Sequence, residues 1–204
     1  MILPACAGIT PVAYSGLQSS SYLAPNPSDD DGRMPYRYAA PVDWRSYNSV
    51  ILDPVVIYRG PDQQFDGVSD EDKQTLASTM RDAFTAALSR RFAFVGEPTP
   101  NTLRIRLTLT GASTSTPVLG TLSRFDLAGG VYNGVQAARG GEGAMTGAVV
   151  FAVEIYDAST NTLLAAYIEK QYPNPYNISA SFGALSAAKV GIEKGAEHLV
   201  ERLR

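Results

Sequence analysis

Two apolar segments joined by an amphipathic one constrain most strongly what this chain can fold into. Residues 50–58 form a nearly continuous apolar run, and residues 103–109 alternate strictly between apolar and polar side chains. A continuous run predicts a central strand with both faces covered, whereas alternation predicts a strand with one buried face. Pro54 cannot donate to a neighbouring strand, so we expect a bulge or an unpaired edge there.

The segment between these strands predicts a long helix that starts after Ser69. Ser69 is a good N-cap, and the acidic residues 70–72 suit the positive end of a helix. Apolar side chains then recur at helical spacing, which gives one buried stripe. The stripe consists of Leu76, Met80, Ala83, Phe84, Ala87 and Leu88. Residues 92–95 could add a short strand.

The C-terminal third predicts a hairpin and a second helix. Residues 145–155 alternate, residues 157–161 suit a turn, and residues 163–172 return. A helix beginning near residue 184 carries a stripe of Leu185, Ala188, Ile192, Ala196, Leu199 and Leu203. This order of elements favours an α+β two-layer sandwich, a mostly antiparallel sheet with two long helices packed on one face.

Composition excludes several classes of function. The chain has 204 residues, of which 45% are hydrophobic, and a net charge of −3, which is typical of a globular protein and argues against a nucleic-acid binder. No apolar run reaches the roughly 20 residues of a membrane-spanning helix. One Cys allows no intrachain disulfide, and one His disfavours most zinc sites and catalytic triads.

Few polar residues are candidates for a site. Asp53 interrupts an apolar run, and we expect it to bond to the backbone or to an Arg because buried charges are normally paired. Arg104 and Arg106 could grip an anionic ligand or lie on a solvated sheet face, and we favour the solvated face. His198 is expected at the surface near a helix end, without a triad partner. The sequence therefore predicts no catalytic residue, no metal ligand and no cofactor.

Residues 1–47 form a Pro- and Ser-rich segment, the arm, ahead of a single α+β domain over residues 48–204. Five tyrosines of the arm could pin it to the domain or form a stacking surface for carbohydrate or peptide. We favour pinning, since an ordered arm must offset its own entropy. These tyrosines are Tyr14, Tyr22, Tyr36, Tyr38 and Tyr47.

The first residues look like a bacterial lipobox. Leu3 lies three residues before Cys6, and small residues flank the cysteine. In lipoproteins the signal peptidase cuts before this cysteine, which then carries the lipid. Pro4 is unusual at its position, and the charged start of a signal peptide is missing, which a start upstream of Met1 or a truncated segment would explain.

Residues 111–146 form a Gly-rich insertion into the domain. Its sequence lacks the Lys-Ser/Thr of a phosphate loop, so nucleotide binding is not expected. Several apolar residues could either cover the core as a flap or present an adhesive patch to a partner. The possible partner-contact residues are Val118, Leu119, Leu122, Phe125, Leu127 and Val131.

Several short motifs resemble a bacterial lipoprotein family, the one that carries domain of unknown function 3313. They are Cys6 in its lipobox-like frame, Ser15-Gly16-Leu17 with Tyr22-Leu23, Asp43-Trp44 with Tyr47 ahead of Asp53-Pro54-Val55, and Asp157 with Thr160. The family commonly has Gly where this chain has Asn161. The resemblance implies a secreted, lipid-anchored periplasmic protein and no particular activity.

Two hypotheses of function follow. The leading one is a non-enzymatic envelope lipoprotein, anchored through Cys6 to a membrane, with the outer membrane favoured, that binds a protein or polymer of the envelope. The alternative is a periplasmic module that binds a small ligand in a pocket under the Gly-rich segment. An exposed apolar patch over residues 118–131 would favour the first, and a pocket with convergent polar groups would favour the second.

Overall fold

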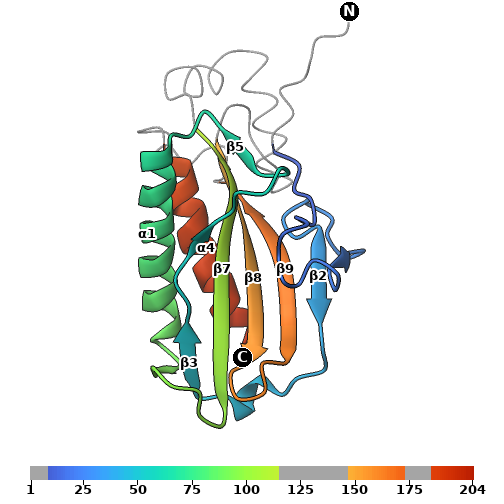
Figure 1. The fold of residues 1–204 in the computed structure, drawn as a ribbon, viewed down its shortest axis with the longest axis vertical. Coiled ribbons are helices and arrows are strands. Elements are labelled where there is room, and N and C mark those ends of the chain that lie inside the picture. The colour runs from blue at the N-terminus through green and yellow to red at the C-terminus, as the bar shows by residue number, and fades with distance from the viewer. Residues whose placement is uncertain (1–8, 115–146, 173–184) are drawn as a thin grey trace, which may run out of the picture.

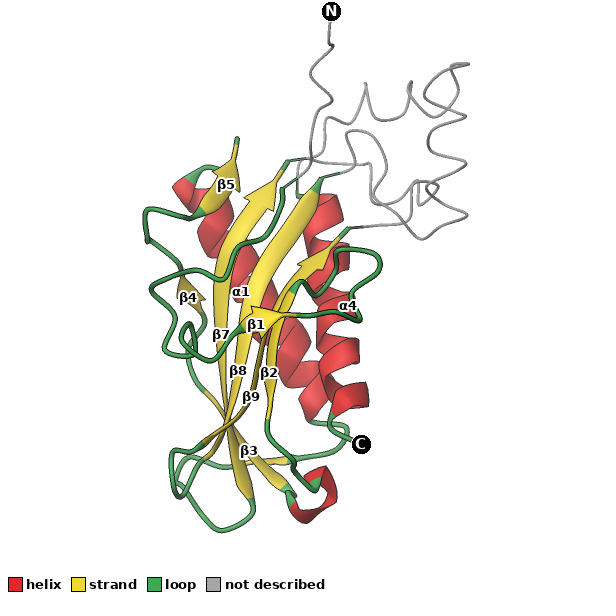
Figure 2. Ribbon diagram, turned by 90° about the vertical axis from the view of Figure 1, so that its right-hand side faces the viewer, coloured by secondary structure: helices red, strands yellow, loops and turns green. Residues whose placement is uncertain are grey.

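In a computed structural model of the chain, residues 9–114, 147–172 and 185–204 are described. They form one mixed, mostly antiparallel sheet with two helices packed on one face (Figures 1 and 2), as the sequence predicts. The sheet order is β1-β2-β9-β8-β7-β3-β6, and β4 and β5 also pair with β7. The α+β two-layer prediction is therefore confirmed.

Three long strands make the centre of the sheet. They are β7 (Thr102–Ser113), β8 (Ala148–Asp157) and β9 (Leu163–Gln171), which pair antiparallel in chain order. The predicted hairpin is confirmed as β8 and β9. The apolar residues at 103, 105, 107 and 109 are all fully buried, as the alternation of β7 predicts. The expectation that only one face of this strand is buried is wrong, because Thr108 and Thr110 on the other face are buried too.

The prediction of one central strand over residues 50–58 is wrong. This run forms two short strands, β3 (Ser49–Leu52) and β4 (Val56–Ile57), which run parallel to β7 on one side of the sheet. The expected interruption at Pro54 separates them. Among the described strands, the short strand β6 (Ala93–Phe94) is the last beyond β3, and β5 (Gln64–Asp66) continues along β7.

Helix α1 (Asp70–Leu88) connects β5, at the C-terminal end of β7, to β6 and the start of β7, and α4 (Ser186–Arg202) lies beside it. The Ser69 hydroxyl caps α1 by accepting a hydrogen bond from the Asp72 N–H, as predicted. Leu76, Met80 and Phe84 of α1 are fully buried. The Phe84 ring meets Phe151 of β8 edge-on, with centroids 5.8 Å apart.

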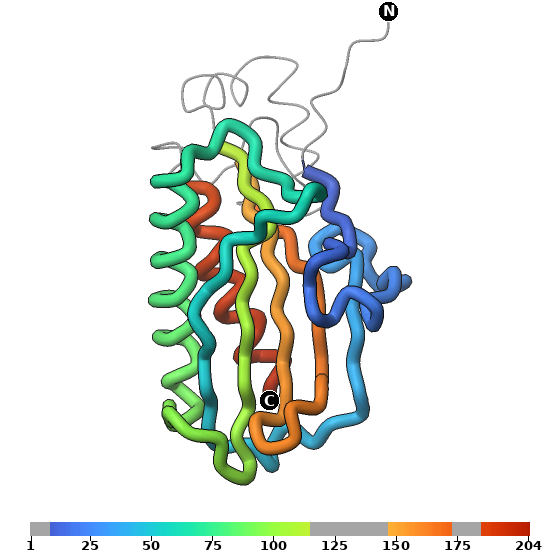
Figure 3. The backbone as a smooth tube through the Cα atoms, viewed as in Figure 1, coloured from blue at the N-terminus to red at the C-terminus, as the bar shows by residue number. Residues whose placement is uncertain are grey.

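The arm lies on the other face of the sheet (Figure 3). Its Tyr14 and Leu17 form a second apolar cluster with Tyr58 and with Val150 and Ala152 of β8, separate from the core under the helices. The arm also supplies β1 (Ala24–Pro25), β2 (Tyr36–Ala39) and the short 3-10 helix η1 (Trp44–Ser46). Strand β2 pairs antiparallel with β9, so the sheet continues into the arm.

The predicted pinning by tyrosines holds for three of the five. Tyr14 is 1% exposed and donates to Gln64, and Tyr47 donates to the Asp157 carboxylate over 2.9 Å. Tyr22 is 54% exposed and packs against Tyr38 with 5.2 Å between ring centroids. Tyr36 is partly buried and packs against the second apolar cluster. Pinning therefore accounts for Tyr14, Tyr36 and Tyr47, whereas Tyr22 leaves an aromatic face open to solvent.

Helix α4 approaches the sheet very closely at Gly195. A Cβ placed there would come within 2.3 Å of the Phe151 ring, which is itself buried against Phe84 and cannot swing away. We expect Gly195→Ala to lower the free energy of unfolding, because overpacking costs about 1–3 kcal/mol, more than the roughly 1 kcal/mol gained in helix propensity. Urea unfolding followed by circular dichroism measures this change.

The exposed Glu193 lies in the same helix, so Glu193→Ala tests helix propensity without the clash. This variant should be as stable as the wild type or slightly more so. A Gly195→Ala variant with wild-type stability would show that α4 does not pack against β8 as closely as described.

A second prediction concerns the turn between β8 and β9. The Asp157 carboxylate accepts hydrogen bonds from Tyr47, Ser159 and Thr160, and the Ser159 hydrogen bond contributes most to lowering the pKa of Asp157 to about 2. The ionised Asp157 carboxylate therefore stabilises the fold. This contribution is fully present above the pKa of Asp in the unfolded chain, about 3.9. This contribution is lost as the pH falls through about 2.

We expect Asp157→Asn to lower the free energy of unfolding at neutral pH by about 1–3 kcal/mol, the usual cost of disrupting a hydrogen-bonded carboxylate. The variant should also lose stability less steeply than the wild type between about pH 4 and 2, the window between the two pKa values. Asp30→Asn, in an exposed turn of the arm, is the matched control. Equal acid sensitivity of both variants and the wild type would contradict this role.

Candidate functional site

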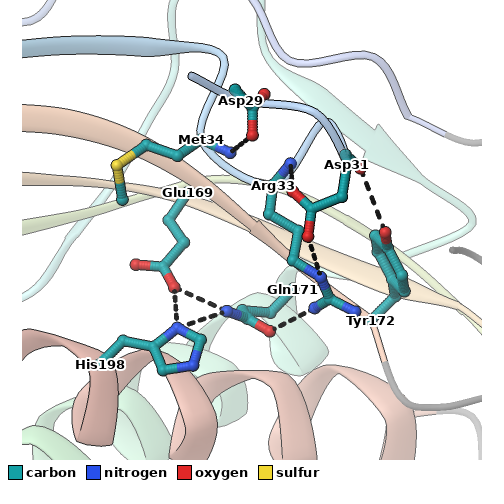
Figure 4. Close-up of polar contacts among 8 residues, drawn as sticks. All are labelled: Asp29, Asp31, Arg33, Met34, Glu169, Gln171, Tyr172 and His198. Atoms are coloured by element: carbon teal, nitrogen blue, oxygen red, sulfur yellow. Dashed lines mark hydrogen bonds and ion pairs between the residues drawn. The ribbon is translucent and has the colours of Figure 1, made fainter. Parts of the chain in front are cut away.

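Several polar groups meet beside α4, where the arm folds back over β9. A pocket of about 300 Å³ lies there, between β2, β9, the C-terminal half of α4 and the arm loop at residues 26–34. Its lining includes Asp29, Asp31, Arg33, Arg37, Glu169, Gln171, His198 and Arg202. The close-up in Figure 4 shows how the central side chains meet.

The register of the hairpin places an acid on the apolar face of the sheet. Glu169 lies opposite Phe151 of β8, and Gln171 lies opposite Val149, so both side chains point toward the helices. Glu169 is 1% exposed. A buried carboxylate needs partners, because removing a charge from water without them is costly.

His198 of α4 supplies one of these partners. Its Nδ1 lies 3.0 Å from Oε1 of Glu169, and the amide of Gln171 donates to the same oxygen over 2.6 Å. The hydrogen bond to Glu169 raises the pKa of His198, although partial burial of the ring opposes this shift. The imidazole is held by a buried counter-ion while 42% of its side chain remains exposed.

The arm joins this network through Arg33. Its Nη1 donates to Oε1 of Gln171 over 2.8 Å, and its Nε lies 3.2 Å from the Asp31 carboxylate. The Arg33 guanidinium also stacks 3.9 Å from the centre of the Tyr172 ring. A continuous chain of polar contacts therefore links the arm to β9 and, through Glu169, to α4 (Figure 4).

Two buried polar atoms of β9 remain without a hydrogen-bond partner among the described residues. They are Oε2 of Glu169 and the hydroxyl of Tyr167, which lie two residues apart on the same face of the strand. Burial, followed by the negative charge of Glu169, raises the pKa of the Tyr167 phenol well above its ordinary value, so it stays a neutral donor. Native structures seldom leave such groups unpaired.

Comparisons with known proteins describe the chain further. The sequence profile of the family of proteins of unknown function DUF3313 matches residues 13–199. The chain belongs to this family. Among curated proteins, no match to this DUF3313 protein is found.

Solved structures with a distantly similar fold exist. One is a PelC dodecamer from Paraburkholderia phytofirmans, 10% identical at a TM-score of 0.40, with 79% of this chain and 94% of that chain covered. Another is the DUF330 protein XCC0632 from Xanthomonas campestris, 9% identical at a TM-score of 0.37, with 87% and 88% covered. Likeness at this level says nothing about activity or assembly.

Some of the candidate residues from the sequence lie within the described part of the DUF3313 structure, and others lie outside it. Cys6 and the possible partner-contact residues Val118, Leu119, Leu122, Phe125, Leu127 and Val131 lie outside the described residues. Asp53 accepts from Arg106 over 2.9 Å and lies 3.6 Å from Arg104, so its predicted pairing with arginine is confirmed.

The structure shows what surrounds Arg104 and Arg106, which the sequence left as either anion-binding or solvated. Arg104 and Arg106 are bound to Asp53, Arg106 also contacts Gln18 of the arm, and their side chains are only about a quarter exposed. The neighbouring Thr108 and Glu154 are buried. The sequence predicts a solvated face at this place, but the arm covers it, and the arginines serve to close that contact.

Sequence reasoning missed Glu169 and therefore the partner of His198. The signal was present in the hairpin. A turn at residues 157–161 pairs Ile155 with Ala165, which in turn places Glu169 across from Phe151. An acid opposite a core phenylalanine on a two-residue period indicates a buried charge, and a buried charge requires a partner from the helix packed above it.

The single histidine makes the Glu169–His198 pair directly measurable. We expect Glu169→Gln to lower the pKa of His198 toward its ordinary value of about 6.5, because the variant removes the negative charge that raises it. An NMR pH titration of the only imidazole signal measures this shift. Glu197→Gln, which neutralises an exposed acid next to His198 in α4, is the control.

The Glu169–His198 pair should also stabilise the fold, but its contribution is lost as the pH rises, whereas that of Asp157 is lost as the pH falls. Since the pKa of His198 is raised in the folded chain, its contribution is fully present below about pH 6.5 and is lost as the pH rises through the raised value. The wild type should lose this increment on going to alkaline pH, and Glu169→Gln should not. An unchanged His198 pKa in Glu169→Gln would show that the pair is not formed in solution.

Proposed function

We propose that this DUF3313 protein is a non-enzymatic lipoprotein of the bacterial envelope. It would be held at the periplasmic side of the outer membrane by a lipid on Cys6 and would bind a protein or polymer of the envelope. The observation that carries this proposal is the lipobox-like frame of Leu3, Ala5 and Cys6 at the start of an arm that is fastened to the domain.

The fastening begins very close to the cysteine. The carbonyl of Ile9 accepts a hydrogen bond from Nζ of Lys170 over 2.6 Å, and the carbonyl of Thr10 accepts one from Gln64 over 2.7 Å. Ile9 follows Cys6 by three residues, a span of at most about 11 Å. A lipid on Cys6 would therefore hold the domain against the membrane surface. No helix among the described residues is long and apolar enough to span a membrane.

A binding role fits the chemistry of the described site better than catalysis. Within residues 9–114, 147–172 and 185–204, the His198 ring contacts Glu169 and Gln171, and neither is a nucleophile that the imidazole could activate. The other strongly bonded acids, Asp53 and Asp157, hold the arm and a turn. These two acids have structural partners and do not line the pocket.

The test uses the chain expressed with its native upstream sequence, beside Cys6→Ala. We expect the wild type to show a diacylglyceryl mass increment and to be recovered with the outer membrane. Both should be lost in the variant, because only the cysteine sulfur can take the lipid. Intact-mass spectrometry and membrane fractionation measure the two properties.

This comparison of the wild type with Cys6→Ala can support or overturn the lipoprotein proposal. Correct folding of the variant, checked by circular dichroism, ensures that the loss reflects the missing lipid. A wild-type product without the mass increment that is recovered without the membrane would overturn the lipoprotein proposal.

A second candidate function is binding of a small ligand. It is favoured by the 300 Å³ pocket at Glu169 and His198, whose volume is at the lower end for ligand sites. The pocket expected under the Gly-rich segment concerns residues 115–146, which lie outside the described residues. The arm, β9 and α4 form the 300 Å³ pocket instead.

A further inference from the structure

Besides Arg33 of the arm loop, three cationic side chains from two elements line the pocket beside β9. Arg37 comes from β2, and His198 and Arg202 come from consecutive turns of α4. They share a pocket of about 300 Å³, which brings them around a common space. Convergent cationic donors are the usual means by which proteins hold carboxylates and phosphates.

Within the part of the chain that the structure describes, these cations have no acidic partner of their own apart from Glu169. The Arg37 side chain has no ion pair or hydrogen bond there, and Arg202 stacks on the Tyr167 ring at 5.3 Å without an ion pair. The acids of the arm loop are already occupied. Asp29 accepts from the Met34 N–H, and Asp31 pairs with Arg33.

Glu169 orients the third donor. It holds Nδ1 of His198, so the other ring nitrogen points away from the buried carboxylate (Figure 4). That nitrogen has no hydrogen-bond partner among the described residues, and the side chain is 42% exposed. A histidine held by a buried carboxylate keeps a fixed tautomer and direction, as in sites where the ring binds a ligand.

We propose that this pocket binds the oxyanionic group of a small ligand, a carboxylate or a phosphate, between Arg37, Arg202 and Nε2 of His198. Glu169 acts as a positioning residue, because it contacts the ligand only through the imidazole. The inference rests on the second candidate function, a ligand-binding pocket, and is independent of lipidation at Cys6.

A cationic ligand fits the same pocket less well. Glu169 Oε2 would be its natural acceptor, but this oxygen is buried. The other two acids of the lining, Asp29 and Asp31, already hold the Met34 N–H and Arg33, whereas Arg37 and Arg202 have no ion pair among the described residues. The accessible donors therefore favour an anion, and the buried acid balances part of their charge.

The test follows the single imidazole signal by NMR while inorganic phosphate, sodium malonate or methylammonium chloride is added to the full chain at constant ionic strength. We expect phosphate or malonate to shift this signal in a saturable way and to raise the pKa of His198, since an anion favours the imidazolium. The two anions distinguish the phosphate from the carboxylate source. Affinity should fall as the pH rises through the pKa of His198.

Variants identify the site. Arg37→Ala and Arg202→Ala should each weaken the binding of the preferred anion by about tenfold, the usual scale for one charge-assisted contact. Arg45→Ala, which removes an exposed arginine of η1, is the matched control and should bind as the wild type does. Glu169→Gln should weaken binding at a pH where the wild-type ring is charged and leave the two arginines in place.

Three results would overturn the proposal. One is an imidazole signal that neither anion shifts. Another is equal weakening by Arg45→Ala, which would indicate non-specific attraction only. The third is a response to methylammonium and not to the anions, which would leave a ligand pocket in place but assign it to cations through Glu169.

Discussion

The three central strands are buried on both faces, and the rest of the molecule is arranged to cover them. Strands β7, β8 and β9 bury nearly every residue, so each face needs a layer of its own. The helices cover one face with apolar stripes. The arm covers the other, where the polar side chains of β7 and β8 must be paired as they leave water. Asp53 with Arg106, and Glu154 with the Ser19 N–H, meet this requirement.

This double cover explains what sequence could and could not predict. The periods of α1, α4 and β7 follow directly from apolar spacing, because each presents one face to the core. The position of residues 50–58 does not follow, since the short parallel strand β3 between β7 and β6 is as apolar as a central strand. The sequence also does not predict that Thr108, Thr110 and Glu154 are buried. Their polar side chains indicate solvent, whereas their actual cover is a distant segment of the chain.

The candidate site depends on the same arrangement at a place where the cover is incomplete. Helix α4 ends at Arg202, and β2 extends the sheet beyond the region that the helices cover. Glu169 is deep enough to be buried, yet it lies beside a space that the arm loop and two arginines enclose. Neither His198 nor Glu169 belongs to a recognisable motif, so only the pairing of β8 with β9 and the packing of α4 bring them together. The hairpin register indicates that Glu169 is buried, but no pattern in the sequence identifies His198, 29 residues away, as its partner.

The way in which the arm is attached also has a mechanical consequence. Tension applied at the N-terminus would reach the fold first at Ile9 and Thr10 and then at Tyr14, where the contacts are separate and can be peeled one after another. The ladder between β2 and β9 begins only at Tyr36. Residues 9–35 could thus extend by several nanometres, at about 3.5 Å per residue, before that ladder is loaded. The arm would then act as an extensible element in series with the domain, and its extension would withdraw the loop at residues 26–34 from the pocket while the paired strands stay intact.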